Sequence, residues 1–323
     1  MTSLIDYKSP MIAPVLPILL QDHTTGENIM WATNSYADRG EGFQERDQIT
    51  PELLLSDDGT LIQPRVYKAL TDQQARTKSH AEVFTPSWTV NLMNNYCDEE
   101  WFGRPDVFNT QEDTQWKTVE GTITFPDGKT WRDYIDSTRL EITCGEAPYI
   151  VSRYDAATGE MIPVKDRIGL LDRKLRVLSE NTADSKEWYK WALRAVKSVY
   201  GYEFQGDSLL IGRINVLMSL EEHFYNRFKR HLTDNRIKEL AGIISWNFWQ
   251  MDGLTDCIPF DEPPDKKEPE MEYAFEAFGD FWGAEAEITV EKTPARECII
   301  KDWKTNIEHT FHSMKECKAY EKI

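Results

Sequence analysis

Hydrophobic residues repeat at helical spacing soon after a stretch rich in chain breakers. From Pro86 onward, Trp88, Leu92 and Tyr96 stand four residues apart, which predicts one face of a helix. Pro86 fits the first turn of that helix, because a proline there loses no intrahelical hydrogen bond. The pattern therefore predicts a helix that begins near Pro86.

Three later segments also have a helical pattern. Apolar residues over 207–230 repeat at three and four positions and predict the best-defined helix of the chain, with Asp207 as its N-cap. A second helix is predicted over 187–198. Within 237–252 a helix is predicted to run into an apolar segment that ends at Asp252.

Strand patterns lie between these helices. Residues 139–145 predict a short strand that runs into a glycine turn, and residues 198–204 predict a second strand that ends in an acid. Residues 147–154 are expected to continue as a helix or a loop. A β-hairpin is predicted around 121–128, where Pro-Asp-Gly follows a run of alternating residues.

Composition divides the chain into four parts. Residues 1–80 hold many Pro and Gly and predict an N-terminal extension of loops and short helices. Residues 81–260 hold the predicted strands and the long helices, and 292–323 are expected to return to that core. Between them, 261–291 carries 11 acids and two lysines. This acidic insertion is interpreted either as a solvated loop, or as a docking surface for a basic partner or a mimic of a phosphate backbone.

The whole chain is strongly acidic, with a formal net charge of −18 over 323 residues. Proteins that bind nucleic acid on their own are usually basic, because phosphate neutralisation supplies most of the affinity. The charge therefore argues against a stand-alone nucleic-acid binder and favours a basic partner subunit, although a local basic cleft can lie on an acidic body.

Cysteine usage and hydropathy indicate the compartment. The five cysteines are scattered and form no Cys-x-x-Cys pair, which predicts reduced thiols and no structural zinc site. No apolar run is long enough to span a bilayer, and no secretion signal is found. We expect a cytoplasmic protein. His309 and His312 have no evident third ligand, so no metal site is expected.

The order of the predicted strands indicates a class of ligand. A glycine turn at Gly145, an acid at Glu203 and a later Asp252 each follow a strand, as in nucleoside sites at the carboxyl ends of a parallel sheet. The separation of Gly145 and Glu203 is much larger than the ~20 residues of a dinucleotide fingerprint. No G-x-G-x-x-G and no P-loop pattern is present, which argues against nicotinamide and P-loop ligands.

Four segments, in order, resemble motifs of S-adenosylmethionine-dependent adenine-N6 DNA methyltransferases. Ala-Glu-Val-Phe-Thr-Pro at 81–86 resembles the family's G-E-V-F-T-P, and Leu-Glu-Ile-Thr-Cys-Gly-Glu-Ala-Pro-Tyr-Ile at 140–150 resembles its first cofactor motif. Tyr-Gly-Tyr-Glu at 200–203, followed by Gly-Arg-Ile-Asn-Val-Leu at 212–217, resembles the second motif. Asn-Phe-Trp-Gln-Met-Asp-Gly-Leu at 247–254 resembles the third. The sequence around these motifs is similar to that of modification subunits of restriction systems.

The resemblance implies a fold and the first residues of a cofactor site. The fold would be α/β, a doubly wound, Rossmann-like class I methyltransferase sheet. Thr85 and Pro86 would contact the methionine part of S-adenosylmethionine. Glu141, Cys144 and Gly145 would line the first turn.

The same resemblance assigns the nucleoside end of the cofactor. Glu203 would hold the ribose hydroxyls through charge-assisted hydrogen bonds. Asp252 would meet the exocyclic amine of the cofactor's adenine, and Phe204 would pack on that ring. Methyl transfer would then depend mainly on positioning of the reactants.

Two departures from the family pattern affect catalysis. Ala147 stands where the family has its second glycine, and the catalytic tetrapeptide (D/N/S)-P-P-(Y/F/W) is not identifiable. The nearest strings are 262–265, which lacks the aromatic residue, and Asp302-Trp303, which lacks both prolines but follows an apolar lead-in. We therefore assign a degenerate catalytic site to Asp302 and Trp303. We expect no recognition domain after them, so sequence specificity would need residues 1–80, an insertion or another subunit.

Three functions remain open at this point. The first is methylation of the exocyclic amine of adenine in DNA, as an enzyme or as a modification subunit that reaches DNA through a basic partner. The second is a catalytically inactive regulatory or partner-docking protein on the same scaffold, such as an anti-restriction protein. The third is a methyltransferase that acts on something other than duplex DNA.

Overall fold

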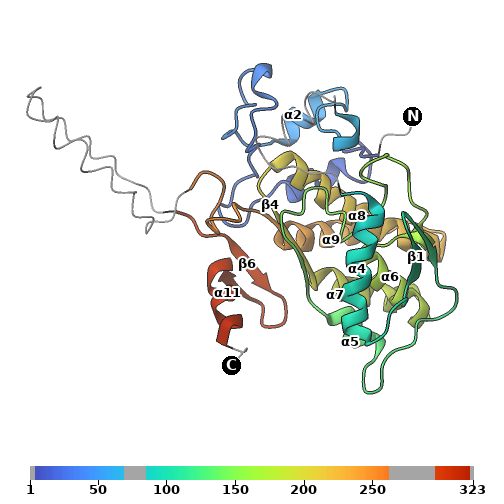
Figure 1. Ribbon diagram of the computed structural model, residues 1–323. Helices are drawn as coiled ribbons and strands as arrows, with labels where there is room; N and C mark the ends of the chain where they lie inside the picture. Colours follow the sequence, from blue (N-terminus) through green and yellow to red (C-terminus); the bar gives the residue numbers. More distant parts are fainter. Residues whose placement is uncertain (1–3, 69–84, 262–294, 321–323) are drawn as a thin grey trace, which may run out of the picture.

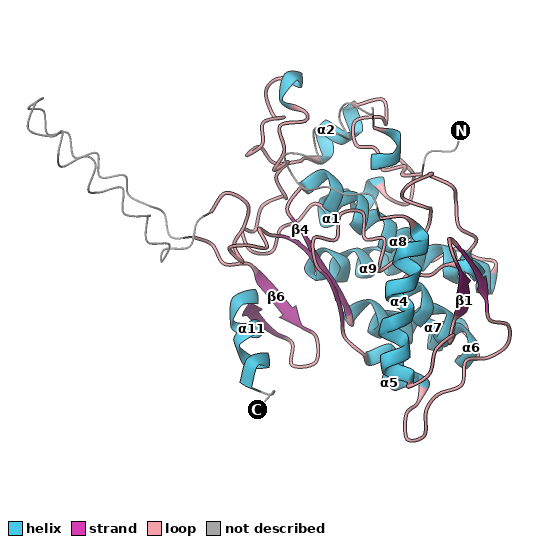
Figure 2. Cartoon of the chain, in the orientation of Figure 1, coloured by secondary structure: helices cyan, strands magenta, loops and turns pink. Residues whose placement is uncertain are grey.

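The computed structural model describes residues 4–68, 85–261 and 295–320. The chain is mixed α/β, with one parallel sheet, two antiparallel hairpins and a group of helices (Figures 1 and 2). Only Asp261 of the acidic insertion belongs to the described residues. The interpretations of 261–291 otherwise lie outside them, as do the first four residues of the predicted motif at 81–86.

The parallel sheet contains the strands that the sequence predicted. Its order is β3 (Arg139–Glu141), β4 (Val199–Glu203) and β5 (Phe248–Gln250). Glu141 lies opposite Gly201, and Glu203 lies opposite Gln250. Sheet order thus follows chain order, and all three carboxyl ends meet at one edge.

Helical crossovers join these strands. The first contains α6 (Leu170–Asn181) and α7 (Ser185–Lys197), and the second contains α8 (Gly206–Phe228) and α9 (Asp234–Asn247). The helices predicted over 187–198, 207–230 and the start of 237–252 are confirmed. Helix α6 was not predicted, because its helical face holds charged side chains such as Asp172, Arg173 and Lys174 that are buried in the structure.

The prediction that Asp207 caps α8 is wrong. Gln205 occupies the N-cap position, and Asp207 lies inside the first turn, fully buried. Its carboxylate accepts hydrogen bonds from the Tyr36 hydroxyl at 2.8 Å and from Lys68 Nζ at 3.0 Å. Partners from the N-terminal segment, not the helix terminus, therefore determine the role of Asp207.

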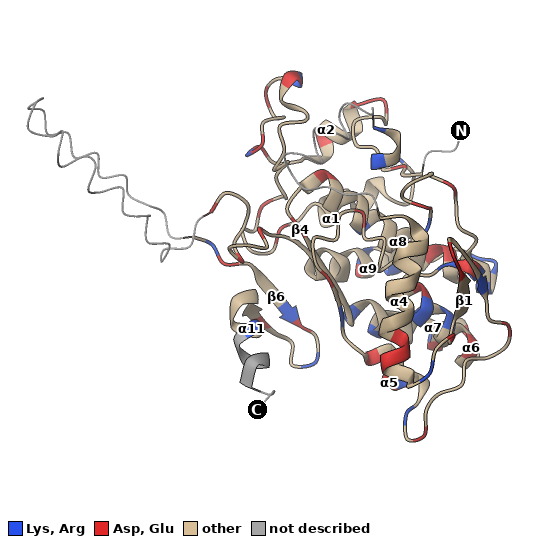
Figure 3. Ribbon diagram, in the orientation of Figure 1, with Lys and Arg blue, Asp and Glu red and all other residues tan. Residues whose placement is uncertain are grey.

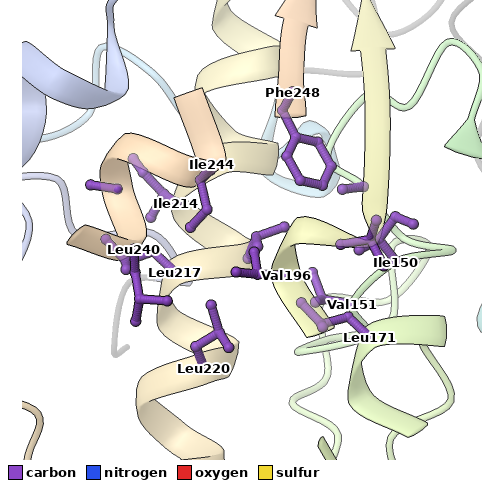
Figure 4. Close-up of a cluster of buried hydrophobic side chains, with 14 of the residues drawn as sticks. Ile150, Val151, Leu171, Val196, Ile214, Leu217, Leu220, Leu240, Ile244 and Phe248 are labelled. Carbon is purple, nitrogen blue, oxygen red and sulfur yellow. The ribbon is translucent and has the colours of Figure 1, made fainter. Parts of the chain in front are cut away.

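The two faces of the parallel sheet pack against different material. Val199 and Phe248 belong to the main core, and Figure 4 shows Phe248 beside apolar side chains of the crossover helices. A methyl group on Gly201 would come within 2.9 Å of the Phe248 ring, so β4 needs glycine there. Tyr202 and Trp249 form a second cluster with residues of β6 (Ile299–Asp302) and α11 (Phe311–Tyr320). Strand β7 (Ile307–Thr310) pairs with β6.

A doubly wound sheet requires strands beyond these three. The described residues provide one three-stranded parallel sheet, and the antiparallel pair β6–β7 covers part of its second face. The doubly wound, Rossmann-like class therefore stays a prediction.

The N-terminal segment is part of the main core. Its apolar residues, among them Leu16 and Trp31, belong to the same buried cluster as the crossover helices. Arg213 of α8 donates hydrogen bonds to the carbonyl oxygens of Leu19 and Phe248, so one buried guanidinium joins this segment to β5. Its elements are short: η1 (Ala13–Val15), α1 (Leu16–Leu19), η2 (Ala37–Arg39), α2 (Pro51–Ser56) and η3 (Arg65–Tyr67).

The segment between the N-terminal part and β3 contains a helix and a hairpin. Helix α4 (Ser87–Phe102) begins where Pro86 predicted it. The hairpin lies earlier than predicted, because β1 (Asn109–Glu112) pairs with β2 (Gln115–Thr118) and 121–128 forms turns. Helix α5 (Trp131–Asp136) follows the hairpin and precedes β3, and η4 (Val164–Asp166) lies after β3. Residues 147–154, expected as a helix or a loop, form turns and a loop.

Candidate nucleoside-cofactor site

Three of the predicted site residues meet at the carboxyl edge of the parallel sheet. Gly145 follows β3, Glu203 ends β4 and Asp252 follows β5. Because the strands are parallel and adjacent, their carboxyl ends lie side by side, which is where open α/β sheets bind ligands.

The turn after β3 is tight and glycine-dependent. Gly145 has a φ of +52°, a left-handed conformation that glycine adopts without strain. Its N–H donates a 2.8 Å hydrogen bond to Oε2 of Glu203, which links the β3 turn to the end of β4. A methyl group on Gly212 of α8 would lie 2.9 Å from the Gly145 carbonyl oxygen, so the helix backbone closely supports this turn.

Glu203 is buried, with 8% of its surface exposed. Besides the bond from Gly145, its Oε1 accepts the N–H of Gln205 at 3.1 Å. The carboxylate therefore clamps the β3 turn to the start of α8.

Glu141 supports the same turn from behind. Its carboxylate accepts the N–H groups of Tyr149 at 3.3 Å and Ile150 at 3.1 Å. The pKa of Glu141 is raised to about 8, mainly by burial and in small part by the nearby Glu203 carboxylate, while the two backbone hydrogen bonds act to lower it. The residue thus acts within the protein as a loop support, and this turn contains two buried acids.

Cys144 and Ala147 complete the turn with small buried side chains. Both are almost fully buried, and burial raises the pKa of the Cys144 thiol well above its ordinary value. A thiol of this kind is inert. Ala147, which replaces the family's second glycine, has a φ of +62° and so occupies the conformation that glycine would favour.

Thr85 and Pro86 lie close to this turn. The Thr85 side chain hydrogen-bonds the Tyr149 side chain, and Tyr149 also donates its N–H to Glu141. Pro86 occupies the N-cap position of α4. The structure therefore brings the start of α4 near the β3 turn.

Phe204 and Asp252 lie toward the β5 side of the edge. Phe204 packs edge-on against Phe260 at 5.6 Å between ring centroids, and Arg46 lies 4.5 Å from the Phe260 ring centroid. Asp252 accepts the Leu254 N–H at 2.8 Å within its own turn. Both residues stand next to the carboxyl ends of the strands.

A polar cavity of about 170 Å³ adjoins this end of β5. Gln250, Arg46 and Asp261 are among its lining residues. The Gln250 side chain donates to the carbonyl oxygen of Phe204 at 2.7 Å and accepts the Met30 N–H at 2.9 Å. Sequence reasoning missed Gln250, because its role depends on contact with the distant N-terminal segment.

Two further residues that support the site lie within the second motif, at 212–217. Asn215 of α8 donates to the carbonyl oxygen of Glu146 in the β3 turn at 3.0 Å. Arg213, two residues earlier in α8, donates to the Phe248 carbonyl oxygen at the start of β5. The Gly-Arg-Ile-Asn string at 212–215 is the sequence feature from which both residues could have been found. In the structure they hold the turn and the strand in place.

Asp302 and Trp303 lie at the other end of the strands. The Trp303 Nε1–H donates a 2.6 Å hydrogen bond to Oδ1 of Asn247, which immediately precedes β5, and Lys197 Nζ lies 4.7 Å from the Trp303 ring centroid. Asp302 accepts the Lys304 N–H at 2.8 Å in the β6–β7 turn. Asn247 and Lys197 mark the amino ends of β5 and β4, so the structure does not bring these two residues to Glu203.

Comparisons with known proteins do not identify the chain. No protein-family model, no curated protein and no solved structure matches it. None of the helices in 4–68, 85–261 and 295–320 is long and apolar enough to cross a membrane.

Proposed function

We propose that the chain binds S-adenosylmethionine at the carboxyl edge of its parallel sheet and provides the cofactor-binding part of a DNA adenine methyltransferase. The observation that carries this proposal is the hydrogen bond between Gly145 and Glu203. It joins the glycine turn to the acid that ends the neighbouring strand, and these are the two groups that the resemblance assigns to the cofactor.

The arrangement suits a nucleoside with a charged tail. The resemblance assigns the ribose hydroxyls to Glu203, at the end of β4, and Phe204 and Asp252 lie on the side where an adenine ring would extend. Thr85 lies near the β3 turn, on the side proposed for the methionine moiety. Transfer itself needs a group that holds the target amine at this same edge.

One observation favours a second function, a non-catalytic partner-docking protein on the same scaffold. The residues assigned to catalysis, Asp302 and Trp303, lie at the amino ends of the strands, and the Trp303 indole is engaged with Asn247. Under this alternative the chain binds cofactor or partner without transferring a methyl group.

The experiment is calorimetric titration of the full chain with S-adenosylmethionine, followed by labelled-methyl transfer to unmethylated DNA. Glu203→Gln is expected to weaken binding about 10- to 100-fold, because charge-assisted hydrogen bonds contribute about 1.5–3 kcal/mol. Asp252→Ala, in an exposed turn, is a second variant that tests the adenine side with less effect on folding. Asp302→Asn, at the opposite edge, is the matched control and is expected to bind normally.

Circular dichroism and urea midpoints are measured for each variant, so that loss of folding is distinguished from loss of affinity. Equal affinity in the wild type, Glu203→Gln and Asp252→Ala would refute the cofactor site. Binding without transfer would favour the docking function.

A further inference from the structure

Helix α4 packs with its polar side inward. Asn94 donates to the carbonyl oxygens of Tyr149 and Ile168, each at 3.0 Å, and is almost fully buried. Asp98, also buried, pairs with Arg173 at 2.5 Å. Hydrogen bonds and an ion pair therefore hold this side of the helix against the protein, together with the buried side chains of Val90 and Phe102.

The apolar side of α4 faces outward. Trp88 is 37% exposed, Leu92 36%, Met93 49% and Tyr96 58%. The sequence predicted Trp88, Leu92 and Tyr96 as one helical face, and the structure confirms the helix but leaves that face uncovered. An exposed apolar face on a helix whose polar side is buried is unusual for a surface helix, which normally shows the reverse.

The neighbouring edge of the parallel sheet is also open. Strand β3 stands at the end of the described sheet and pairs only with β4. The Arg139 N–H donates to Ser198 beside β4, and neighbouring residues of a strand direct their backbone groups to opposite sides, so those of Leu140 point away from β4. Leu140 is 45% exposed and Ile142 63%.

These two features lie on either side of Tyr149. The Tyr149 carbonyl accepts a bond from Asn94 of α4, and its N–H donates to Glu141 of β3. Of the twelve large hydrophobic residues that are exposed in the described chain, six lie on α4, on β3 or directly after β3: Trp88, Leu92, Met93, Tyr96, Leu140 and Ile142. Such concentration of apolar surface marks interaction sites, and unpaired strand edges are templates for another strand.

Charge indicates which partner fits. Helix α4 contains no Lys or Arg, and Glu99 and Glu100 are exposed one turn beyond Tyr96 (Figure 3). The whole chain carries a net charge of −18. A second copy would bring like charges together at this surface, whereas a basic protein would be complementary.

We propose that the β3 edge and the outer face of α4 form a docking surface for a basic partner protein, which adds a β-strand beside β3. Backbone hydrogen bonds to Leu140 would give affinity, and the apolar face of α4 would cover alternate side chains of the added strand. This proposal does not depend on cofactor binding.

The test uses a synthetic strand peptide, Lys-Val-Lys-Val-Lys-Val-Lys, as probe for the full-length chain. Binding is measured by fluorescence anisotropy of a labelled peptide at low salt. We expect at least ten-fold tighter binding than for the same peptide with Glu in place of Lys. A peptide with N-methylated valines, which cannot pair as a strand, is expected to lose binding.

Neutral polar variants locate the binding surface. Leu140→Asn combined with Ile142→Asn, and separately Leu92→Asn, are each expected to weaken peptide binding at least ten-fold. Ile307→Asn, which changes an exposed apolar residue on β7, is the matched control and is expected to bind normally. Because all these positions are exposed, folding is expected to survive, and circular dichroism checks it.

Hydrogen exchange and sedimentation complete the test. The Leu140 amide is expected to exchange rapidly in the free chain and to be protected by the Lys peptide. Slow exchange in the free chain would mean that the chain covers its own edge, and would overturn the proposal. A dimer that dissociates in the Leu140→Asn/Ile142→Asn variant would identify a second copy as the occupant and also overturn it. Equal binding of the Lys and Glu peptides would refute the proposal that the partner is basic.

Discussion

Replacing Glu141 by glutamine is predicted to remove a loss of stability that the wild type undergoes as pH rises toward 8. The Glu141 carboxyl is buried behind the β3 turn, with 8% of its surface exposed, and burial raises its pKa from 4.5 to about 8. The folded protein therefore keeps a proton between these two values that the unfolded chain has already released.

The sign and the size follow from proton linkage. Where the folded state binds one more proton than the unfolded state, the free energy of unfolding falls as pH rises, by about 1.4 kcal/mol per pH unit. Between pH 4.5 and 8 this amounts to ~5 kcal/mol, a large part of a typical total stability of about 5–15 kcal/mol. Stability from this group is fully present below pH 4.5 and is lost toward pH 8.

Glutamine at position 141 cannot titrate. Its carbonyl oxygen accepts one of the N–H groups of Tyr149 and Ile150 and leaves the other without its acceptor, at a cost of about 1–3 kcal/mol. We therefore expect Glu141→Gln to be less stable than the wild type at pH 5 and more stable at pH 8.

The assay is urea unfolding followed by tryptophan fluorescence at pH 5, 6, 7 and 8. The pH dependence of the difference between wild type and variant isolates this one group. Glu308→Gln, which makes the same chemical change at an exposed position on β7, is the control and should follow the wild type. Parallel pH profiles for Glu141→Gln and the wild type would refute the reasoning.

Three further outcomes are expected. Burial lowers the pKa of His23 to about 4, so this group's contribution is present above pH 6.5 and lost as pH falls toward 4; the acid loss of stability should be smaller in His23→Gln, measured by urea unfolding. Gly201→Ala should destabilise the fold by about 1–3 kcal/mol through overpacking against Phe248, and an unchanged urea midpoint would contradict this packing. Trp303→Phe should cost about 1 kcal/mol by removing the bond to Asn247 and leave S-adenosylmethionine affinity unchanged; a large loss of affinity would return Trp303 to the cofactor site.

Local patterns in the sequence predicted most of the elements around the candidate site. The strands that end at Glu141 and Glu203, and the long helix after Glu203, are visible because each element buries apolar residues with its own period. Their order also predicted that Gly145 and Glu203 would meet, since adjacent parallel strands place their carboxyl ends together. The identity of the ligand stays a prediction.

Roles that depend on distant partners could not be inferred in the same way. Asp207 is of a residue type that often caps helices, but its carboxylate accepts hydrogen bonds from the Tyr36 hydroxyl and Lys68 instead. Asp302 and Trp303 follow an apolar strand as a catalytic motif would, yet β6 pairs with β7 and so places them at the amino ends of the parallel strands. Local sequence carries no information on which end of a sheet a remote hairpin will cover.

The sequence by itself determined which residues share a helix or a strand, because backbone geometry fixes those periods. Only the tertiary structure decided which way each face points. Trp88, Leu92 and Tyr96 share one face of α4, but the buried partners of Asn94 and Asp98 draw the opposite face inward. A hydrogen-bonded ion pair removed from water must keep its partners, and this requirement outweighed the burial of three apolar side chains.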